Sequence, residues 1–323
     1  PEQSGLEKAL FTMMTKGSSK YSFEKRQQIS YEKSASVYQS CGSGASILSV
    51  SCLNYYMDEM IPVLTDSFLN PAFTKPVYET MMTEFNQSIQ SALNNPWGLL
   101  DYTVEKEAYK GHPYEAEISP NAESIENITI DNMKKWHKTI LDSRRICIVA
   151  VVSMKPEDLV KKLNSSLGSI KALKTELKEV KIPDVKISGE PVVLTHPSAS
   201  GSGYIMNSFA APSTVSEDYI PAALASSIYS TTVYNVVRTK YGACYTPGSS
   251  MNGSKANLGN EYLYMASNLK DFAKYMKEAR NIMAKGKYEK EIKPYLDEIR
   301  KAGGLGIFPH PTWRREAYHI PEA

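Results

Sequence analysis

The sequence predicts an α+β protein of two similar domains, each a mainly antiparallel sheet backed by helices. Its 323 residues exceed the usual size of one domain and suffice for two cores. Apolar residues make up 42% of the chain and charged residues 22%, a composition typical of globular proteins that excludes disorder and fibres. The order strand, strand, helix occurs in both halves and favours an internal duplication.

The first half begins with a helix at residues 5–16, where apolar side chains recur at helical spacing up to Gly17. Alternating apolar residues within 33–53 predict a strand pair that turns at 41–44. The remaining expected elements are a helix from Tyr56 that contains Pro62 and stops at Asn70-Pro71, helices at 75–93, 97–109 and 130–142, and a buried strand at 145–153.

The second half follows a segment rich in lysine and glutamate at 161–190, which we interpret as a solvated, partly helical linker. The expected elements after it are strands at 191–195 and 204–210, a helix at 217–238, strands at 243–250 and 260–266, and a helix at 269–285. We therefore predict a first domain at 1–160 and a second at 191–290. The segment 291–323 shows no clear periodicity and receives no role.

The composition of the chain argues against several classes of binding partner and of metal or disulfide site. The 37 basic and 35 acidic residues nearly cancel, so nothing points to nucleic acid or to an anionic membrane. No apolar run approaches the roughly 18–20 residues that a membrane-spanning helix needs. The four cysteines lie far apart without a CxxC pair, which argues against a zinc ribbon and a dense disulfide framework. Cys147 lies in an apolar run and is expected to be a buried, inert thiol.

Four passages together resemble the pitrilysin and insulin-degrading family of zinc peptidases, the inverzincins. They are Gly5–Ser18, similar to the family's motif helix G-x-x-H-x-x-E-H-M-x-F-x-G-T; Leu64–Phe73; the loop Gly111–Tyr114 with the stretch Ile125–Trp136; and Val237–Tyr245. The resemblance covers about residues 5 to 285. It implies that the chain is half of a peptidase clamshell.

The motif helix, aligned on Lys16-Gly17-Ser18, lacks the family's zinc ligands. The family places two histidines four residues apart on one helix face, with a glutamate beside them as general base. This sequence has Lys8 and Thr12 at the histidine positions and Phe11 at the glutamate position. A lysine repels a dication, a phenylalanine takes no proton, and a lone threonine is a poor ligand. We therefore expect no catalytic residue and no metal in this chain, with zinc held by a catalytic partner half.

The remaining ligand positions give the same expectation. Residues 85–93, where the resemblance places the third ligand, contain no carboxylate, and Glu84 just outside matches only a secondary acid of the family. The five histidines do not pair at ligand spacing; they are His112, His137, His196, His310 and His319. Taken alone, the apolar stripe of 5–16 is typical of a helix packed in a core, to which Phe11 adds packing.

Arg238 and Tyr245 match the Arg and Tyr with which the family's inactive half holds substrate at the partner's zinc. By this resemblance, the Arg238 guanidinium orients a bound peptide and the Tyr245 phenol stabilises the tetrahedral intermediate. The alternative from spacing alone is that Arg238 caps helix carbonyls while Tyr245 packs on a sheet.

The expected function is thus a non-catalytic half or subunit that binds peptides and completes the chamber of a catalytic half, on another chain or in a homo-oligomer. A purely structural subunit, like the inactive relatives in respiratory complexes, is the alternative, and an active enzyme with unusual ligands is a third hypothesis. The family places strands before the motif helix, so we expect a first domain without its N-terminal strands, in a fragment of a longer protein. No targeting segment is visible; a periplasmic and an organellar location both stay open.

Overall fold

The computed structural model describes residues 2–177, 180–187, 189–199, 201–286, 288 and 292–293. The expected C-terminal segment at 291–323, with His310 and His319, lies almost entirely outside these residues. Two compact units form: unit 1 is 1–90 with 116–180, and unit 2 is 91–115 with 181–323. Residues 91–115 thus belong to the second unit, although their place in the sequence assigned them to the first domain.

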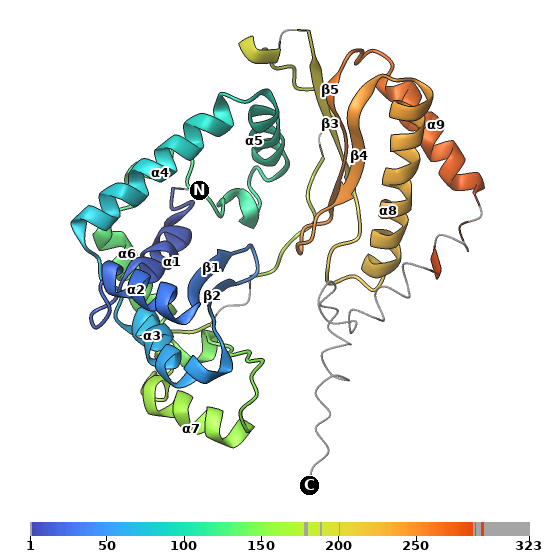
Figure 1. The fold of residues 1–323 in the computed structure, drawn as a ribbon. Helices are drawn as coiled ribbons and strands as arrows, with labels where there is room; N and C mark the ends of the chain where they lie inside the picture. Colours follow the sequence, from blue (N-terminus) through green and yellow to red (C-terminus); the bar gives the residue numbers. More distant parts are fainter. Residues whose placement is uncertain are drawn as a thin grey trace. The chain divides into compact units, whose positions relative to one another are not determined.

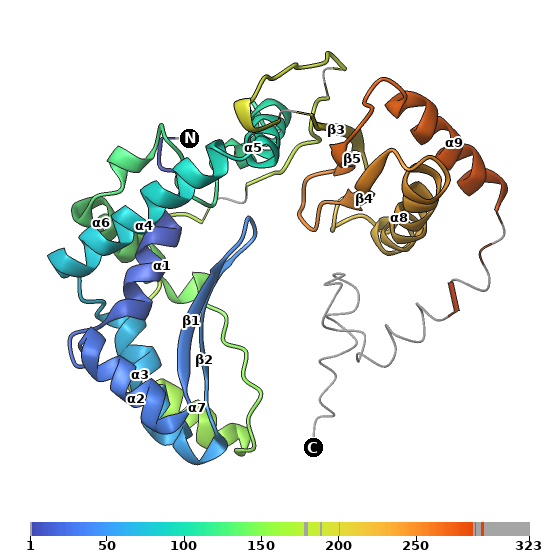
Figure 2. The same cartoon turned by 45° about the horizontal axis from the view of Figure 1, so that its top comes forward.

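Unit 1 combines helices with one antiparallel hairpin, which lies alongside α1 and α3 (Figure 2). In the hairpin Val37 faces Val50 and Gln39 faces Leu48. The elements of unit 1 are α1 (Leu6–Lys16), α2 (Phe23–Lys33), β1 (Ser36–Cys41), β2 (Ser46–Ser51), α3 (Met57–Leu69), α4 (Lys75–Leu93, whose end passes into unit 2), α6 (Ile130–Ile140) and α7 (Pro156–Leu167). The expected helices and strand pair up to residue 142 are therefore confirmed, while α7 occupies the start of the expected linker.

The apolar face of α1 is the centre of the unit 1 core. Its buried members are Leu6, Ala9, Leu10, Phe11, Met13 and Met14, joined by Met81, Ile128 and Met133. Burying one such large side chain contributes about 1.5–3 kcal/mol. The helix starts after Gly5, whose φ of 77° and close approach to the Pro120 backbone leave no room for a Cβ atom.

A buried polar network joins the ends of the first three helices. Arg26 of α2 donates to the Met14 carbonyl at 2.9 Å and to the Ser67 hydroxyl of α3. Asp66, next to Ser67, accepts the Lys20 backbone N–H at 3.0 Å and the Asn70 side-chain amide at 2.9 Å. Burial lowers the pKa of Arg26 to about 10, opposed by the neighbouring Asp66 charge.

Unit 2 is a three-stranded antiparallel sheet with helices on both faces (Figure 1). The strand order is β3-β5-β4, so β5 lies in the centre. The elements of unit 2 are α5 (Pro96–Ala108), β3 (Gly203–Ala210), α8 (Tyr219–Tyr234), the π-helix Asn235–Lys240, β4 (Cys244–Met251), β5 (Leu258–Ala266) and α9 (Phe272–Lys285). The expected elements from 204 to 285 are confirmed.

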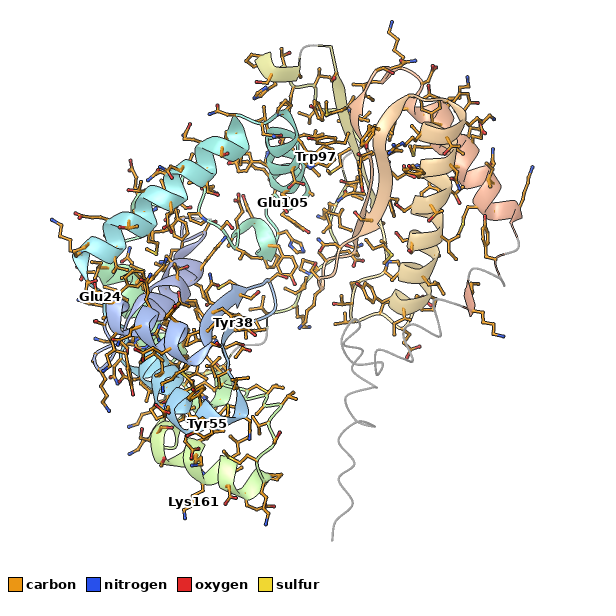
Figure 3. All side chains as sticks on the ribbon, in the orientation of Figure 1. Glu24, Tyr38, Tyr55, Trp97, Glu105 and Lys161 are labelled. Atoms are coloured by element: carbon orange, nitrogen blue, oxygen red, sulfur yellow. The ribbon has the colours of Figure 1, made fainter. Side chains whose placement is uncertain are left out.

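Successive side chains of β5 lie on opposite faces of this sheet. Tyr262 and Tyr264 contact Trp97 of α5, with ring centroids 5.6 and 5.3 Å apart, and Figure 3 shows Trp97 between α5 and the strands. Leu263, on the opposite face, is fully buried in the core that includes Val233 of α8 and Met276 of α9. This aromatic contact is the physical reason why 91–115 packs with the second unit.

Two expected strands are absent from the described residues. Residues 145–153 follow the short 3-10 turn Ser143–Arg145 as irregular backbone, and Val149 and Val151 are 79% and 98% exposed. Cys147 is exposed as well, so its expected burial is wrong. Residues 191–195 are also irregular, with Val193 88% exposed. An apolar run becomes a strand only where a neighbouring strand pairs with its backbone groups, and neither run has such a partner among the described residues.

Candidate functional site

The positions on α1 that correspond to zinc ligands are filled by internal contacts. The Lys8 ammonium donates to the Ser119 hydroxyl at 2.7 Å. Phe11 is only 6% exposed and belongs to the core of unit 1. The Thr12 hydroxyl donates to the Lys8 carbonyl at 2.7 Å and accepts the Gln39 amide at 3.3 Å. An ammonium, a phenyl ring and a hydroxyl bound to its own helix do not form a donor set for Zn²⁺.

Other acids near α1 are also engaged in contacts that hold the unit together. Glu7 accepts the Trp136 indole N–H of α6 at 2.8 Å and the Ser46 hydroxyl of β2. On α4, Phe85 packs against the α1 core, and the stretch 85–93 supplies no carboxylate. Within the described part of the chain, no three His, Cys, Asp or Glu side chains gather where they could hold a metal ion. The residues present therefore do not fit a zinc site.

Two histidines of unit 2 act as connectors between distant segments. His112 Nε2 lies 3.0 Å from the Pro183 carbonyl, and His112 Nδ1 accepts the Tyr114 backbone N–H at 3.0 Å. His196 repeats this pattern: Nε2 lies 3.2 Å from the Leu93 carbonyl, and Nδ1 accepts the Ser198 N–H at 3.1 Å. Because Nδ1 is the acceptor, the proton lies on Nε2 in both rings. Both ring nitrogens of each histidine are thus engaged with backbone groups.

Arg238 and Tyr245 are brought together by a turn between a helix and a strand. The π-helix carrying Arg238 ends before Gly242, which has a φ of 58°, and β4 begins at Cys244. Such π-helical turns are rare and often occur at functional sites. An Arg238 guanidinium N–H donates to the Tyr245 carbonyl at 2.9 Å, and the guanidinium carbon lies 4.0 Å from the Tyr245 ring centre.

This geometry differs from the alternative drawn from spacing alone. Arg238 donates to a carbonyl of strand β4 rather than to the helix end. The Tyr245 side chain is not packed on a sheet, since the residue is 69% exposed. A guanidinium and a phenol are therefore presented side by side at the surface of unit 2, where both can offer hydrogen-bond donors.

Tyr234 is a further member of this group that the sequence motif did not single out. Its ring centre lies 5.2 Å from the Arg238 guanidinium carbon. Tyr234 precedes Arg238 by four positions, and side chains three or four residues apart share a helix face. That spacing was the available signal, although it is common on any helix.

Two sequence comparisons agree on the family to which this chain is similar. A family profile described as "Peptidase M16 inactive domain" matches residues 127–299. A curated relative, the "Non-peptidase homolog YmxG" of Helicobacter pylori (strain ATCC 700392 / 26695), is 21% identical over 166 residues. The match covers 51% of this chain and 38% of that relative, so the chain spans well under half the length of the protein it matches.

Solved structures share the fold. A peptidase M16 inactive domain from Pseudomonas fluorescens has a TM-score of 0.73 at 16% identity, covering 94% of this chain and 74% of that chain. The periplasmic protease PqqL from Escherichia coli gives 0.71 at 14% identity, covering 94% of this chain and 34% of its own. The ferredoxin protease FusC, solved as a mutant in complex with Arabidopsis ferredoxin, gives 0.64 at 15% identity and covers 94% and 33%.

Proposed function

The chain belongs to the family of peptidase M16 inactive domains, and on that premise we propose that it is a non-catalytic half that binds extended peptides for a catalytic partner. The resemblance to the pitrilysin family is thereby confirmed at the level of family and fold. Peptide binding, the partner and the shared chamber are the proposed steps. In this proposal zinc belongs to the partner, because the α1 positions of this chain hold Lys8, Phe11 and Thr12.

The observation that carries the proposal is the pairing of Arg238 with Tyr245 at an exposed position. The guanidinium is oriented by the Tyr245 carbonyl and keeps further N–H groups for a peptide carbonyl. The Tyr245 phenol, on a residue that is 69% exposed, adds a second donor. Two more findings support the proposal: the relative YmxG is described as a non-peptidase homologue, and PqqL and FusC are about three times as long as the part of them that this chain covers.

The test is peptide binding by the full chain, followed by cleavage when a catalytic M16 half is added. A fluorescein-labelled, unstructured peptide of mixed composition is titrated and its anisotropy recorded. A hydrogen bond from a charged donor is worth about 1.5–3 kcal/mol, so Arg238→Ala should weaken binding by about tenfold or more. Tyr245→Phe should act mainly on the cleavage rate, because it removes only the hydroxyl.

Arg145→Ala is the matched control, since Arg145 is an exposed arginine of unit 1. Its binding curve should overlay that of the unaltered chain. Equal binding and cleavage by all four proteins would refute the peptide-binding role and favour the purely structural subunit. Stoichiometric zinc in the pure chain, with cleavage in the absence of a partner, would instead favour an active enzyme with unusual ligands.

A further inference from the structure

Three side chains, at the end of α8, in the π-helix that follows it and at the start of β4, form a group that we call the tyrosine–arginine stack. Its members are Tyr234, Arg238 and Tyr245. The Arg238 guanidinium carbon lies 5.2 Å from the ring centre of Tyr234 and 4.0 Å from that of Tyr245. A guanidinium is planar, and aromatic rings attract it by cation–π contact. The two tyrosines therefore hold one cation in place from separate elements.

The positive charge of this stack is not neutralised within the described residues. Arg238 makes no ion pair in that part of the chain; its described hydrogen bond goes to the neutral Tyr245 carbonyl. The nearby Lys240 differs, because its ammonium lies 2.6 Å from the Glu278 carboxylate. Glu278 also accepts the Tyr241 hydroxyl at 2.8 Å. The local acid is thus committed to Lys240 and Tyr241, and Arg238 keeps a full charge that a ligand can meet.

The stack also limits how a ligand can approach. Aromatic rings within 4.0 and 5.2 Å occupy the space near the guanidinium, while most of its N–H groups, which point along its edges, have no partner among the described residues. An in-plane approach suits a group with two oxygens in one plane, since a carboxylate accepts two parallel N–H bonds from arginine. A peptide carbonyl offers one oxygen and no charge, so it satisfies this site less completely.

We propose that the tyrosine–arginine stack selects peptides that carry a carboxylate, either an acidic side chain or a free C-terminus. This inference rests on the proposed peptide-binding function and adds a preference to it. Tyr234 enters as a specificity-determining residue through its ring face. The two sources of carboxylate share one chemistry, and matched peptides tell them apart.

The experiment compares three peptides of otherwise identical sequence on the full chain, free of other acidic residues and carrying a nitrobenzoxadiazole label, which has no carboxylate. The first has a central glutamate and an amidated C-terminus, the second a central glutamine and an amidated C-terminus, and the third a central glutamine and a free C-terminus. Charge-assisted bidentate bonds are about twice as strong as neutral ones, so we expect the first or the third to bind about tenfold tighter than the second. Whichever of the two binds tighter identifies the source of the carboxylate.

Variants of the stack then assign the preference to its members. Arg238→Gln should abolish it, and Arg238→Lys should reduce it, because lysine keeps the charge without the fork. Tyr234→Leu should reduce it about two- to fivefold, the usual worth of an exposed cation–π contact, whereas Tyr234→Phe should retain it. Circular dichroism spectra that match the unaltered chain show that each variant is folded.

The outcomes separate this inference from the proposed function. Equal affinity for all three peptides, with binding still lost in Arg238→Ala, would overturn the carboxylate preference and leave peptide binding intact. A preference that survives Arg238→Gln would overturn the assignment to the stack. Absence of binding by every peptide would overturn the proposed function together with the inference.

Discussion

Units 1 and 2 differ in whether the side chains at their motif positions are engaged in internal contacts or available at the surface. In unit 1, the helix that resembles a catalytic motif turns its key positions inward or onto neighbours: Phe11 joins the core, Thr12 bonds its own helix, and Lys8 bonds Ser119. In unit 2, Arg238 and Tyr245 remain available at the surface. The three motif positions thus serve packing and internal hydrogen bonds in unit 1, while unit 2 keeps a polar pair whose contacts leave donors unused among the described residues.

The buried polar groups of the two units differ as well. Unit 1 buries a cation beside an acid: Arg26 is held by the Met14 carbonyl and Ser67, near Asp66, which is 5% exposed. Unit 2 buries an anion, Glu261 on the central strand, which is only 2% exposed. Glu261 accepts the Tyr229 hydroxyl at 2.5 Å and two Arg280 N–H groups at 3.1 and 2.5 Å. Because Tyr229 lies on α8 and Arg280 on α9, this one carboxylate fastens both helices to the sheet.

The largest expected effect comes from removing that carboxylate. Glu261→Ala leaves the Arg280 guanidinium and the Tyr229 hydroxyl without their acceptor, and breaking a buried ion pair usually costs about 3–5 kcal/mol. Arg280 is still 55% exposed at its side chain and stays hydrated, so we expect the lower end, about 3 kcal/mol. Urea unfolding measures the loss, and hydrogen exchange should place it in unit 2.

Glu261→Gln is the control that keeps the shape and removes the charge. It should cost less than the alanine variant, because the amide oxygen still accepts one donor. Faster exchange throughout α1 and α6 in Glu261→Ala would contradict the separation of the two units, because it would mean that one cooperative core spans both.

The corresponding change in unit 1 is Arg26→Ala. It removes the hydrogen bonds to Met14 and Ser67 and the packed stem of the side chain, for an expected loss of about 2–3 kcal/mol. The loss is moderated because Arg26 Nε has no partner among the described residues, so the burial of that atom is an existing cost. Urea unfolding with exchange monitored in α2 and α3 tests this.

Arg145→Ala serves again as the exposed arginine control and should stay within about 0.5 kcal/mol. If Arg26→Ala were equally silent, the buried network would not contribute to the stability of unit 1, and packing of the α1 face alone would hold the three helices together.

Acidification should affect unit 1 through His137. This histidine of α6 is buried, and its Nε2 lies 2.7 Å from the Phe68 carbonyl. Burial lowers the pKa of His137, opposed by that hydrogen bond. The unfolded chain therefore binds a proton at its ordinary pKa of about 6.5 before the folded chain does, so stability falls as pH drops below that value and is constant above it.

The check is the unfolding free energy of the intact chain and of His137→Gln across this range. The glutamine amide can still donate to the Phe68 carbonyl but does not titrate, so its curve should be flatter in the acid limb. Parallel curves for the two proteins would show that His137 is not the source of the acid sensitivity.

Sequence reasoning succeeded where the determining interactions are local. The apolar spacing of α1, the turn between β1 and β2, and the order of β3 to α9 follow from side-chain period and turn chemistry. The family was also within reach, because the spacing of the motif is recognisable although Lys8, Phe11 and Thr12 stand at its ligand and base positions. The two expected strands at 145–153 and 191–195 failed because strand formation depends on a partner that the local sequence does not specify. Likewise, the attachment of 91–115 to unit 2 depends on Trp97 meeting two tyrosines far along the chain.

The candidate site was predictable only in part. The motif points to Arg238 and Tyr245, and Gly242 between them indicates the turn that joins them. The motif does not point to Tyr234, because an aromatic residue four positions before an arginine occurs on many helices. Tyr234 becomes part of the candidate site only because Tyr245, on another element, contacts the same Arg238 guanidinium.

The smallest expected effect concerns the apolar runs that did not become strands. Val151 of unit 1 and Val193 of unit 2 are 98% and 88% exposed, so truncation to alanine removes no buried surface. Each change should alter the unfolding free energy by less than about 0.5 kcal/mol. Val63 of α3, which is 2% exposed, is the matched control, and Val63→Ala should cost on the order of 1–2 kcal/mol through lost burial and a cavity. A cost for Val151→Ala equal to that of Val63→Ala would mean that the run is covered in solution, either by other parts of the protein or by a second copy.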